Sequence, residues 1–168
     1  MATSQAQINI GTALKFNGEA GADVAFSMEG RTTTNGQVSA QHDLGASPRD
    51  FMFNWHAEIL AQATPTLGKT VDFYAVAAPD NDATQIDGDV GASDANITGS
   101  TQVVNLLWIG SVVWDAADTS KQNGSGTFSH TSRYISILGI NNTGATLNAT
   151  DTNFLFYLTP YNIQGQAT

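Results

Sequence analysis

The feature that most constrains the fold is the strict alternation in the segment FMFNWHAEI, residues 51–59. Its odd-numbered positions are Phe, Phe, Trp, Ala and Ile, whereas its even-numbered positions are Met, Asn, His and Glu. Successive side chains of a β-strand point to opposite faces. The segment therefore predicts a half-buried strand whose Phe/Trp face belongs to the core.

Shorter runs of the same kind recur along the chain, separated by turns rich in Gly, Asn and Asp. Val24, Phe26 and Met28 alternate, and the Asn35-Gly36 pair predicts a type I′ hairpin that joins 24–34 to 37–44. Further strands are expected at 71–78, 102–116, 127–141 and 153–160, and a long polar loop at 79–101. The run 102–116 is apolar on both faces, which predicts a place deep in the fold.

About eight strands and no convincing helix predict an all-β, antiparallel β-sandwich of the jelly-roll type. Residues 1–22 are polar, small and rich in Gly and Ala, so we expect an extended N-terminal arm, followed by a sandwich domain at 23–168. Within the arm, Ala6, Ile8 and Ile10 share one side of an extended segment. They are the candidate partner-binding residues, because such a strand can add to the sheet edge of a neighbouring chain.

The charge balance disfavours several classes of partner. The chain has 15 Asp and Glu residues against 6 Lys and Arg, a net charge of −9. Nucleic acid and anionic membrane surfaces attract cations, so neither is expected as a partner. The chain contains no cysteine, which excludes disulfides, Cys-based zinc sites and thiol nucleophiles. The first residues lack a charged region followed by an apolar one, so we expect no secretory signal.

The segment 39–59 holds most of the side chains that could perform catalysis: Ser39, His42, Asp43, Ser47, His56 and Glu58. In a strand, neighbours such as His42 and Asp43 point to opposite faces and cannot share a site. His56 and Glu58 share the polar face of their strand and could form a hydrogen bond. No G-x-S-x-G motif is present, and we expect no enzyme here and no cofactor.

Three other patterns have both a functional and a structural interpretation. The segment 79–94 holds five aspartates, but its spacing does not match a calcium-binding EF-hand loop, so we favour a solvated loop. The aromatic residues, including Trp55, Trp108 and Trp114, could form a sugar-binding platform; core packing is favoured, and Trp114 is the best exposed candidate. Arg133 could bind a carboxylate across an interface, although a solvated strand start is the commoner role.

The succession of strands and turns resembles a known family. SAQHDLG, FNWHAEI, PTLGKTVDFYAVAAPD, RYISILGINNTGATL and NFLFYLTPYN follow one another as in the head decoration, or cement, proteins of tailed bacteriophages. The resemblance spans roughly residues 35–162. It implies a β-sandwich, often a jelly roll, that trimerises at symmetry axes and stabilises the shell. It implies no catalytic residues.

The leading hypothesis is a structural virion protein that is made in the host cytoplasm and binds the outer capsid surface. Its expected partners are the major capsid protein and its own copies, as a homotrimer. The alternative, from a different class, is a carbohydrate-binding jelly-roll module in a phage tail or receptor-binding assembly. A small β-sandwich hydrolase is the third hypothesis.

Overall fold

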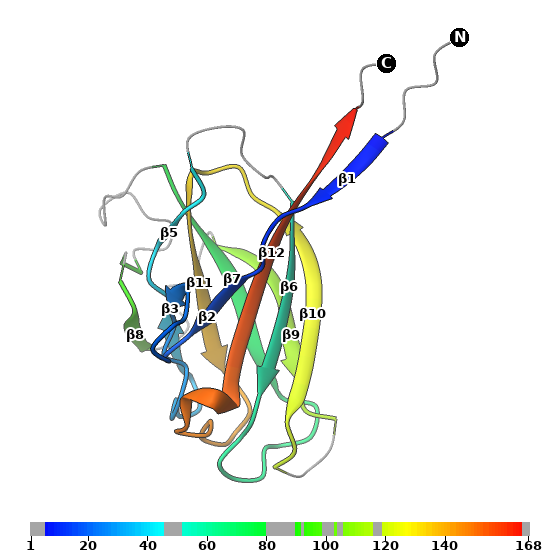
Figure 1. Ribbon diagram of the computed structural model, residues 1–168. Helices are drawn as coiled ribbons and strands as arrows, with labels where there is room; N and C mark the ends of the chain where they lie inside the picture. The colour runs from blue at the N-terminus through cyan, green and yellow to red at the C-terminus, as the bar shows by residue number, and fades with distance from the viewer. Residues whose placement is uncertain are drawn as a thin grey trace.

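The computed structural model describes residues 6–45, 52–79, 90–91, 93–98, 103, 106–115 and 119–165. Two sheets pack face to face, so the prediction of an all-β, largely antiparallel sandwich is confirmed (Figure 1). Its jelly-roll form stays a prediction. The described residues form twelve strands rather than about eight, because several are only two to five residues long. No helix in this part of the chain is long and apolar enough to cross a membrane.

Sheet A follows the order β10-β6-β12-β2-β3, with β1 paired to the end of β12. Its strands are β1 (Ala6–Ile10), β2 (Leu14–Asn17), β3 (Val24–Ala25), β6 (Met52–Ile59), β10 (Gln122–Ser129) and β12 (Phe154–Gly165). Sheet B follows the order β8-β4-β11-β7-β9, with β5 paired to β11. Its strands are β4 (Asn35–Val38), β5 (His42–Asp43), β7 (Thr70–Ala78), β8 (Ala95–Thr98), β9 (Leu107–Val113) and β11 (Tyr134–Asn141).

Trp55 on β6 lies at the centre of the core between the sheets. The prediction for this strand is confirmed, since its odd-numbered residues from Phe53 to Ile59 are all buried; Phe51 lies outside the described residues. The Trp55 indole stacks on Phe156 at 5.9 Å between ring centroids and is tilted against Phe73 at 5.7 Å. Its Nε1 donates a hydrogen bond of 2.9 Å to the carbonyl oxygen of Ile109 on the opposite sheet.

Glycines give the Trp55 ring its space. A Cβ at Gly126 would lie 2.6 Å from Trp55 Nε1, and one at Gly110 would lie 2.4 Å from Trp55 Cζ2. Both distances are shorter than van der Waals contact allows. A third glycine, Gly124, would place a Cβ 3.3 Å from the same ring. The glycines of β9 and β10 thus form a surface against which only a flat ring of this size fits.

A second apolar cluster lies on the outer face of sheet B. Its buried members are Val38, Val76, Ala78, Val90, Ile97, Leu138 and Ile140. With apolar clusters on both faces, β11 is buried along seven of its eight residues. One member of the cluster, Ile97, comes from β8, the edge strand beside β4, which lies inside the segment 79–101 that was expected to be a polar loop throughout. That expectation is wrong at 95–98, because these residues form a short strand whose Ile97 is buried in this outer cluster.

The Asn35-Gly36 hairpin prediction is wrong. These residues form the start of β4, which pairs with β11 and β8 and not with the preceding segment. The turn lies just before them, where the Asn35 amide donates to the Thr32 carbonyl and Thr34 has a φ of 68°. Gly36 is needed for a close approach instead, because a Cβ there would lie 2.7 Å from the Gly139 oxygen. Val24, Phe26 and Met28 are buried as expected, but only Val24–Ala25 forms a strand.

The prediction that 102–116 lies deep in the sandwich is also wrong. Within this run, β9 is the edge strand of sheet B, and Leu107, Trp108 and Val113 are exposed. The strand with both faces covered is β11. An apolar run indicates a preference for burial. Which run is covered on both faces depends on the strand order in the sheet, and that order is set by contacts between residues far apart in the sequence.

The sandwich begins before residue 23, so the boundary expected at residue 22 lies too late in the chain. Phe16 on β2 is fully buried and contacts Phe156 edge to face at 5.8 Å. β1 and β2 lie in series along β12, and the Gly11 amide between them donates to the Pro160 carbonyl at 2.8 Å. Pro160 has no N–H to donate in return, which is consistent with an interruption at this point.

Candidate functional site

The potentially catalytic side chains of the segment 39–59 do not converge on one site among the described residues. The fully buried Ser39 hydroxyl accepts the Ile137 amide at 2.9 Å and donates to the Ala40 carbonyl, so it replaces a backbone partner in sheet B. His42 is half-buried, and desolvation lowers its pKa. Ser47 lies outside the described residues. Each of these described groups is accounted for by packing or backbone satisfaction.

Asp43 and Arg133 form a bidentate ion pair at the edge of the fold. The guanidinium donates from Nε and Nη2 to the two carboxylate oxygens at 2.9 and 2.7 Å. This hydrogen bonding holds the pKa of Asp43 well below its usual range. Arg133 also lies over the Tyr134 ring, 5.0 Å from its centroid. Arg133 therefore lies directly before β11 with a partly exposed side chain, as the commoner role predicted, and the carboxylate that it binds belongs to its own chain.

His56 and Glu58 share the outer face of sheet A, as their spacing predicted. His56 Nε2 lies 3.4 Å from Glu58 Oε1, and Lys121 Nζ lies 3.3 Å from the other oxygen of that carboxylate. All three side chains are partly exposed on a flat polar face. The group resembles a surface ion-pair network, which contributes little to stability.

The aspartate-rich segment contributes one described carboxylate, Asp94; Asp80, Asp82, Asp87 and Asp89 lie outside the described residues. Asp94 accepts hydrogen bonds from the Ser27 amide at 3.1 Å and the Ser27 hydroxyl at 2.5 Å, and a short one from Gln37 Nε2. It therefore fastens the start of β8 to the segment after β3 and to β4. No group of three or more potential metal-ligating side chains occurs in the described part of the chain.

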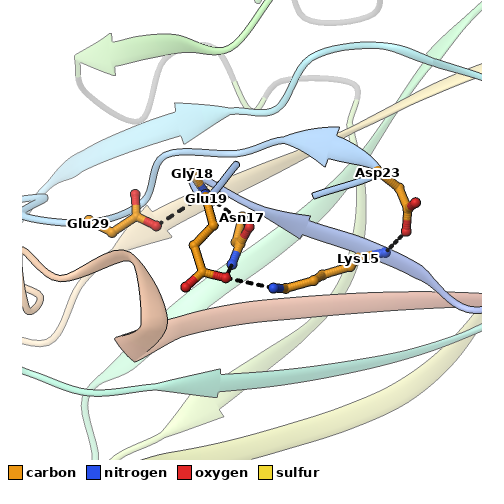
Figure 2. Close-up of polar contacts among 6 residues, drawn as sticks. All are labelled: Lys15, Asn17, Gly18, Glu19, Asp23 and Glu29. Carbon is orange, nitrogen blue, oxygen red and sulfur yellow. Dashed lines mark hydrogen bonds and ion pairs between the residues drawn. The ribbon is translucent and has the colours of Figure 1, made fainter. Parts of the chain in front are cut away.

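A network of charged side chains organises the turn after β2, a feature that the sequence interpretation missed. Figure 2 shows Lys15 and Asn17 converging on Glu19, with Glu29 directed at the Gly18 amide. The Lys15 ammonium lies 2.6 Å from Glu19 Oε2, and the Lys15 amide donates to Asp23 at 2.7 Å. The motif NGEAGAD, with its dense turn residues, was the available signal for such a structure.

This turn borders an open depression of about 570 Å³ on the side of η4 (Asp151–Asn153). It is lined by Glu19, Ala20 and residues 149–152. Hydrogen bonds from Lys15 and Asn17 lower the pKa of Glu19, so this carboxylate stays charged and already has donors. Burial raises the pKa of nearby Glu29. Glu19 is held in position by Lys15 and Asn17, and the other polar side chains that line the depression are Thr150, Asp151 and Thr152.

The exposed tryptophan is Trp108 and not Trp114. Trp114 is fully buried in the main core, because its amide and carbonyl pair with the turn at Gly68 and Lys69 and so hold it inside. Trp108 on β9 has 57% of its surface exposed. The choice of Trp114 as the best exposed candidate is therefore wrong, whereas the favoured core packing is confirmed for Trp55 and Trp114. The sequence places Trp108 in the middle and Trp114 at the end of one apolar run, and this position alone does not indicate which of the two is exposed.

The first and last described strands meet in a projecting two-stranded ribbon. We define the terminal ribbon as β1 together with residues 161–165 of β12, which pair antiparallel in the register Ile10↔Tyr161 to Ala6↔Gly165. Figure 1 shows the ribbon extending away from the sandwich. Of the three predicted partner-binding residues, Ile8 and Ile10 are exposed by 62% and 71%. Ala6 is placed on the same strand, at its first residue.

No family model and no curated protein matches the chain. Among solved structures, the chain is similar to a protein described as "EclA C-terminal domain; sugar-binding protein". The two share 11% sequence identity with a TM-score of 0.34 over 98% of this chain and 80% of the other. At that TM-score the similarity supports no inference about function.

Proposed function

We propose that the chain is a structural virion protein that attaches to the outer surface of a tailed-phage capsid through its terminal ribbon. The observation that carries this proposal is the exposure of Ile8 and Ile10 on a strand that projects from the sandwich. The partner class comes from the resemblance of residues 35–162 to phage decoration proteins.

The ribbon has the properties of a strand that can extend a neighbouring sheet. β1 pairs with β12 along one edge, and its other edge has no paired strand in the described structure. Free N–H and C=O groups along such an edge can pair with a strand of another chain. Ile8 and Ile10 lie two residues apart and share a face, so they would supply apolar contacts and fix the register.

The two isoleucines can supply a useful part of the binding free energy. Full burial of an isoleucine side chain contributes about 1.5–3 kcal/mol. Even half of that for each of the two residues totals about 1.5–3 kcal/mol, which corresponds to roughly a ten- to hundredfold change in Kd. The backbone of the ribbon is already ordered by its in-chain pairing, which lowers the entropic cost of binding.

The resemblance also implies self-association, and we extend the proposal to a closed homotrimer, since soluble oligomers generally adopt closed symmetry. Light scattering on the full chain tests this directly. A trimer has three times the 17.7 kDa mass of the chain. A monomer at micromolar concentration contradicts this part of the proposal and leaves attachment by the ribbon standing.

Two measurements test attachment. A mass-spectrometric inventory of purified virions of the phage that encodes the chain should contain it as an abundant component; its absence rejects the proposal. Purified protein is then added to shells that lack it and sedimented. Wild-type protein should co-sediment, and the Ile8→Asp/Ile10→Asp variant should bind at least about tenfold more weakly.

The matched control is Leu67→Asp. Leu67 is 61% exposed, but it lies in the turn after β6, at the end of that strand opposite to the ribbon. This variant receives the same apolar-to-acidic change and should bind shells as wild type does. Equal binding by the ribbon variant and wild type rejects the ribbon as the attachment element. Thermal melts of both variants should match wild type, because neither side chain contacts the core.

A further inference from the structure

Trp108 is exposed on the outer face of sheet B, next to a second aromatic side chain. In the register of β7 and β9 it is paired with Tyr74. Directly paired residues of antiparallel strands have side chains on the same face. Phe73 and Ala75 point into the main core, so Tyr74 and Trp108 both point outward. Tyr74 packs against the outer apolar cluster, whereas more than half of Trp108 is in contact with solvent.

A fixed carboxylate lies beside these rings. Asp72 is the next outward-facing residue on β7, and its Oδ1 accepts the Ser111 hydroxyl of β9 at 2.5 Å. Its Oδ2 accepts Asn142 Nδ2 at 2.7 Å. Burial and the nearby Asp72 charge raise the pKa of Tyr74, which is consistent with the two side chains lying close together. Each carboxylate oxygen retains acceptor capacity, since an ionised carboxylate has about four lone-pair sites.

We propose that this face, formed by Trp108, Tyr74 and Asp72, binds a neutral sugar ring of a glycan. The apolar face of a pyranose stacks on an exposed indole, because both surfaces are flat and weakly hydrated. Residues two apart along a strand are separated by about 6.7 Å, so a ring over Trp108 and Tyr74 places hydroxyl groups near Asp72. Those hydroxyls donate to a carboxylate that Ser111 and Asn142 already hold in position.

Asp72 decides between a glycan and a protein as the occupant. Covering a carboxylate with an apolar protein surface leaves it desolvated and costs several kcal/mol. Sugar hydroxyls supply neutral donors and remove that cost. The net charge of −9 disfavours anionic sugars. The inference does not rest on attachment through the terminal ribbon, which belongs to sheet A.

The test uses the full chain with an array of immobilised neutral oligosaccharides, followed by titration with the soluble hexasaccharide of the best-bound sugar. Isothermal titration calorimetry reports binding, because it measures wild type and the variants that lack the exposed Trp108 indole in the same way. We expect saturable binding that Trp108→Ala weakens at least tenfold, that Trp108→Phe partly retains and that Asp72→Ala also weakens. Val113→Ala, a change at a half-exposed apolar residue of the same strand, should leave Kd unchanged.

Three results overturn the inference. One is the failure of every neutral oligosaccharide to bind at about 1 mM, the weak end of specific recognition. Another is saturable binding that is unchanged in Trp108→Ala, which places the site elsewhere. The third is a loss of oligomer mass or of shell binding in Trp108→Ala with no glycan bound by wild type, which identifies the face as a protein interface.

Discussion

Replacement of Trp55 by alanine is the perturbation that the core arrangement predicts most sharply. The side chain is 2% exposed, stacks on Phe156 and donates its indole N–H to the Ile109 carbonyl. The glycines at 110, 124 and 126 surround the ring with backbone. Backbone held in two sheets cannot collapse far into the vacated space, so the cavity should persist in Trp55→Ala.

The magnitude follows from area and from the lost hydrogen bond. A buried tryptophan removes about 150–250 Å² from water. At about 25 cal/mol per Å² this area contributes roughly 4–6 kcal/mol, which is an upper bound. Measured large-to-small changes of this type cost about 3–5 kcal/mol. The Ile109 carbonyl then lacks its partner, which adds about 1 kcal/mol unless water enters. We expect a total loss of about 4–5 kcal/mol.

Urea unfolding followed by circular dichroism measures this loss, with linear extrapolation to water. The control is Trp108→Ala, the same substitution at an exposed site, which should change the free energy of unfolding by no more than about 0.5 kcal/mol. If Trp55→Ala lowers the free energy of unfolding by less than about 1 kcal/mol, the Trp55 ring is not a packed part of the core and the prediction is refuted. Equal losses in the two variants refute it as well.

Three further predictions concern packing, charge and metal. Gly126→Ala should destabilise the fold by about 1–3 kcal/mol in the same urea assay, because the added Cβ would meet the Trp55 indole. The control, Ser125→Ala on the exposed face of β10, should have little effect. Arg133→Gln should raise the pKa of Asp43 towards about 3.9 in an NMR titration. Because the folded-state pKa of Asp43 is depressed, the pair stabilises the fold above about pH 4. That contribution is lost as the pH falls through the folded-state pKa. If Asp43 titrates identically in Arg133→Gln and in wild type, the ion pair is contradicted. EDTA should leave the melting temperature unchanged, and a sharp fall would show that the aspartate-rich segment 79–94 binds a structural cation.

The sequence predicts the buried face of β6 because the relevant signal is local. A period of two needs only neighbouring residues, and a strand with one face on the core shows it directly. The same reasoning correctly assigns Val24, Phe26 and Met28 to the core, although most of that segment lies outside a strand. Alternate side chains can be buried even where the backbone is irregular, whereas a β-strand also requires backbone hydrogen bonds to a partner strand.

Pairing partners are the information that local patterns lack. Asn35-Gly36 has the sequence of a hairpin turn, yet the structure uses Gly36 for its missing Cβ, where β4 approaches Gly139 of β11. The two residues are about a hundred positions apart in the chain. Trp108 and Trp114 illustrate the same limit, since their opposite exposures depend on where β9 lies within sheet B.

The bulge in β9 connects the core to the proposed binding face. In its register with β7, Gly110 pairs with Phe73 and Trp108 pairs with Tyr74, so Ile109 is the extra residue. A one-residue insertion of this kind reverses which face the following side chains occupy. Regular pairing would have placed Ile109 outward and Trp108 inward, next to Ala75.

The bulge instead buries Ile109, directs its carbonyl at the Trp55 indole and leaves Trp108 in solvent. Gly110 makes this possible, because its φ of 145° and its contact with Trp55 both exclude a Cβ. The packing of one tryptophan in the core therefore determines the exposure of another on the surface.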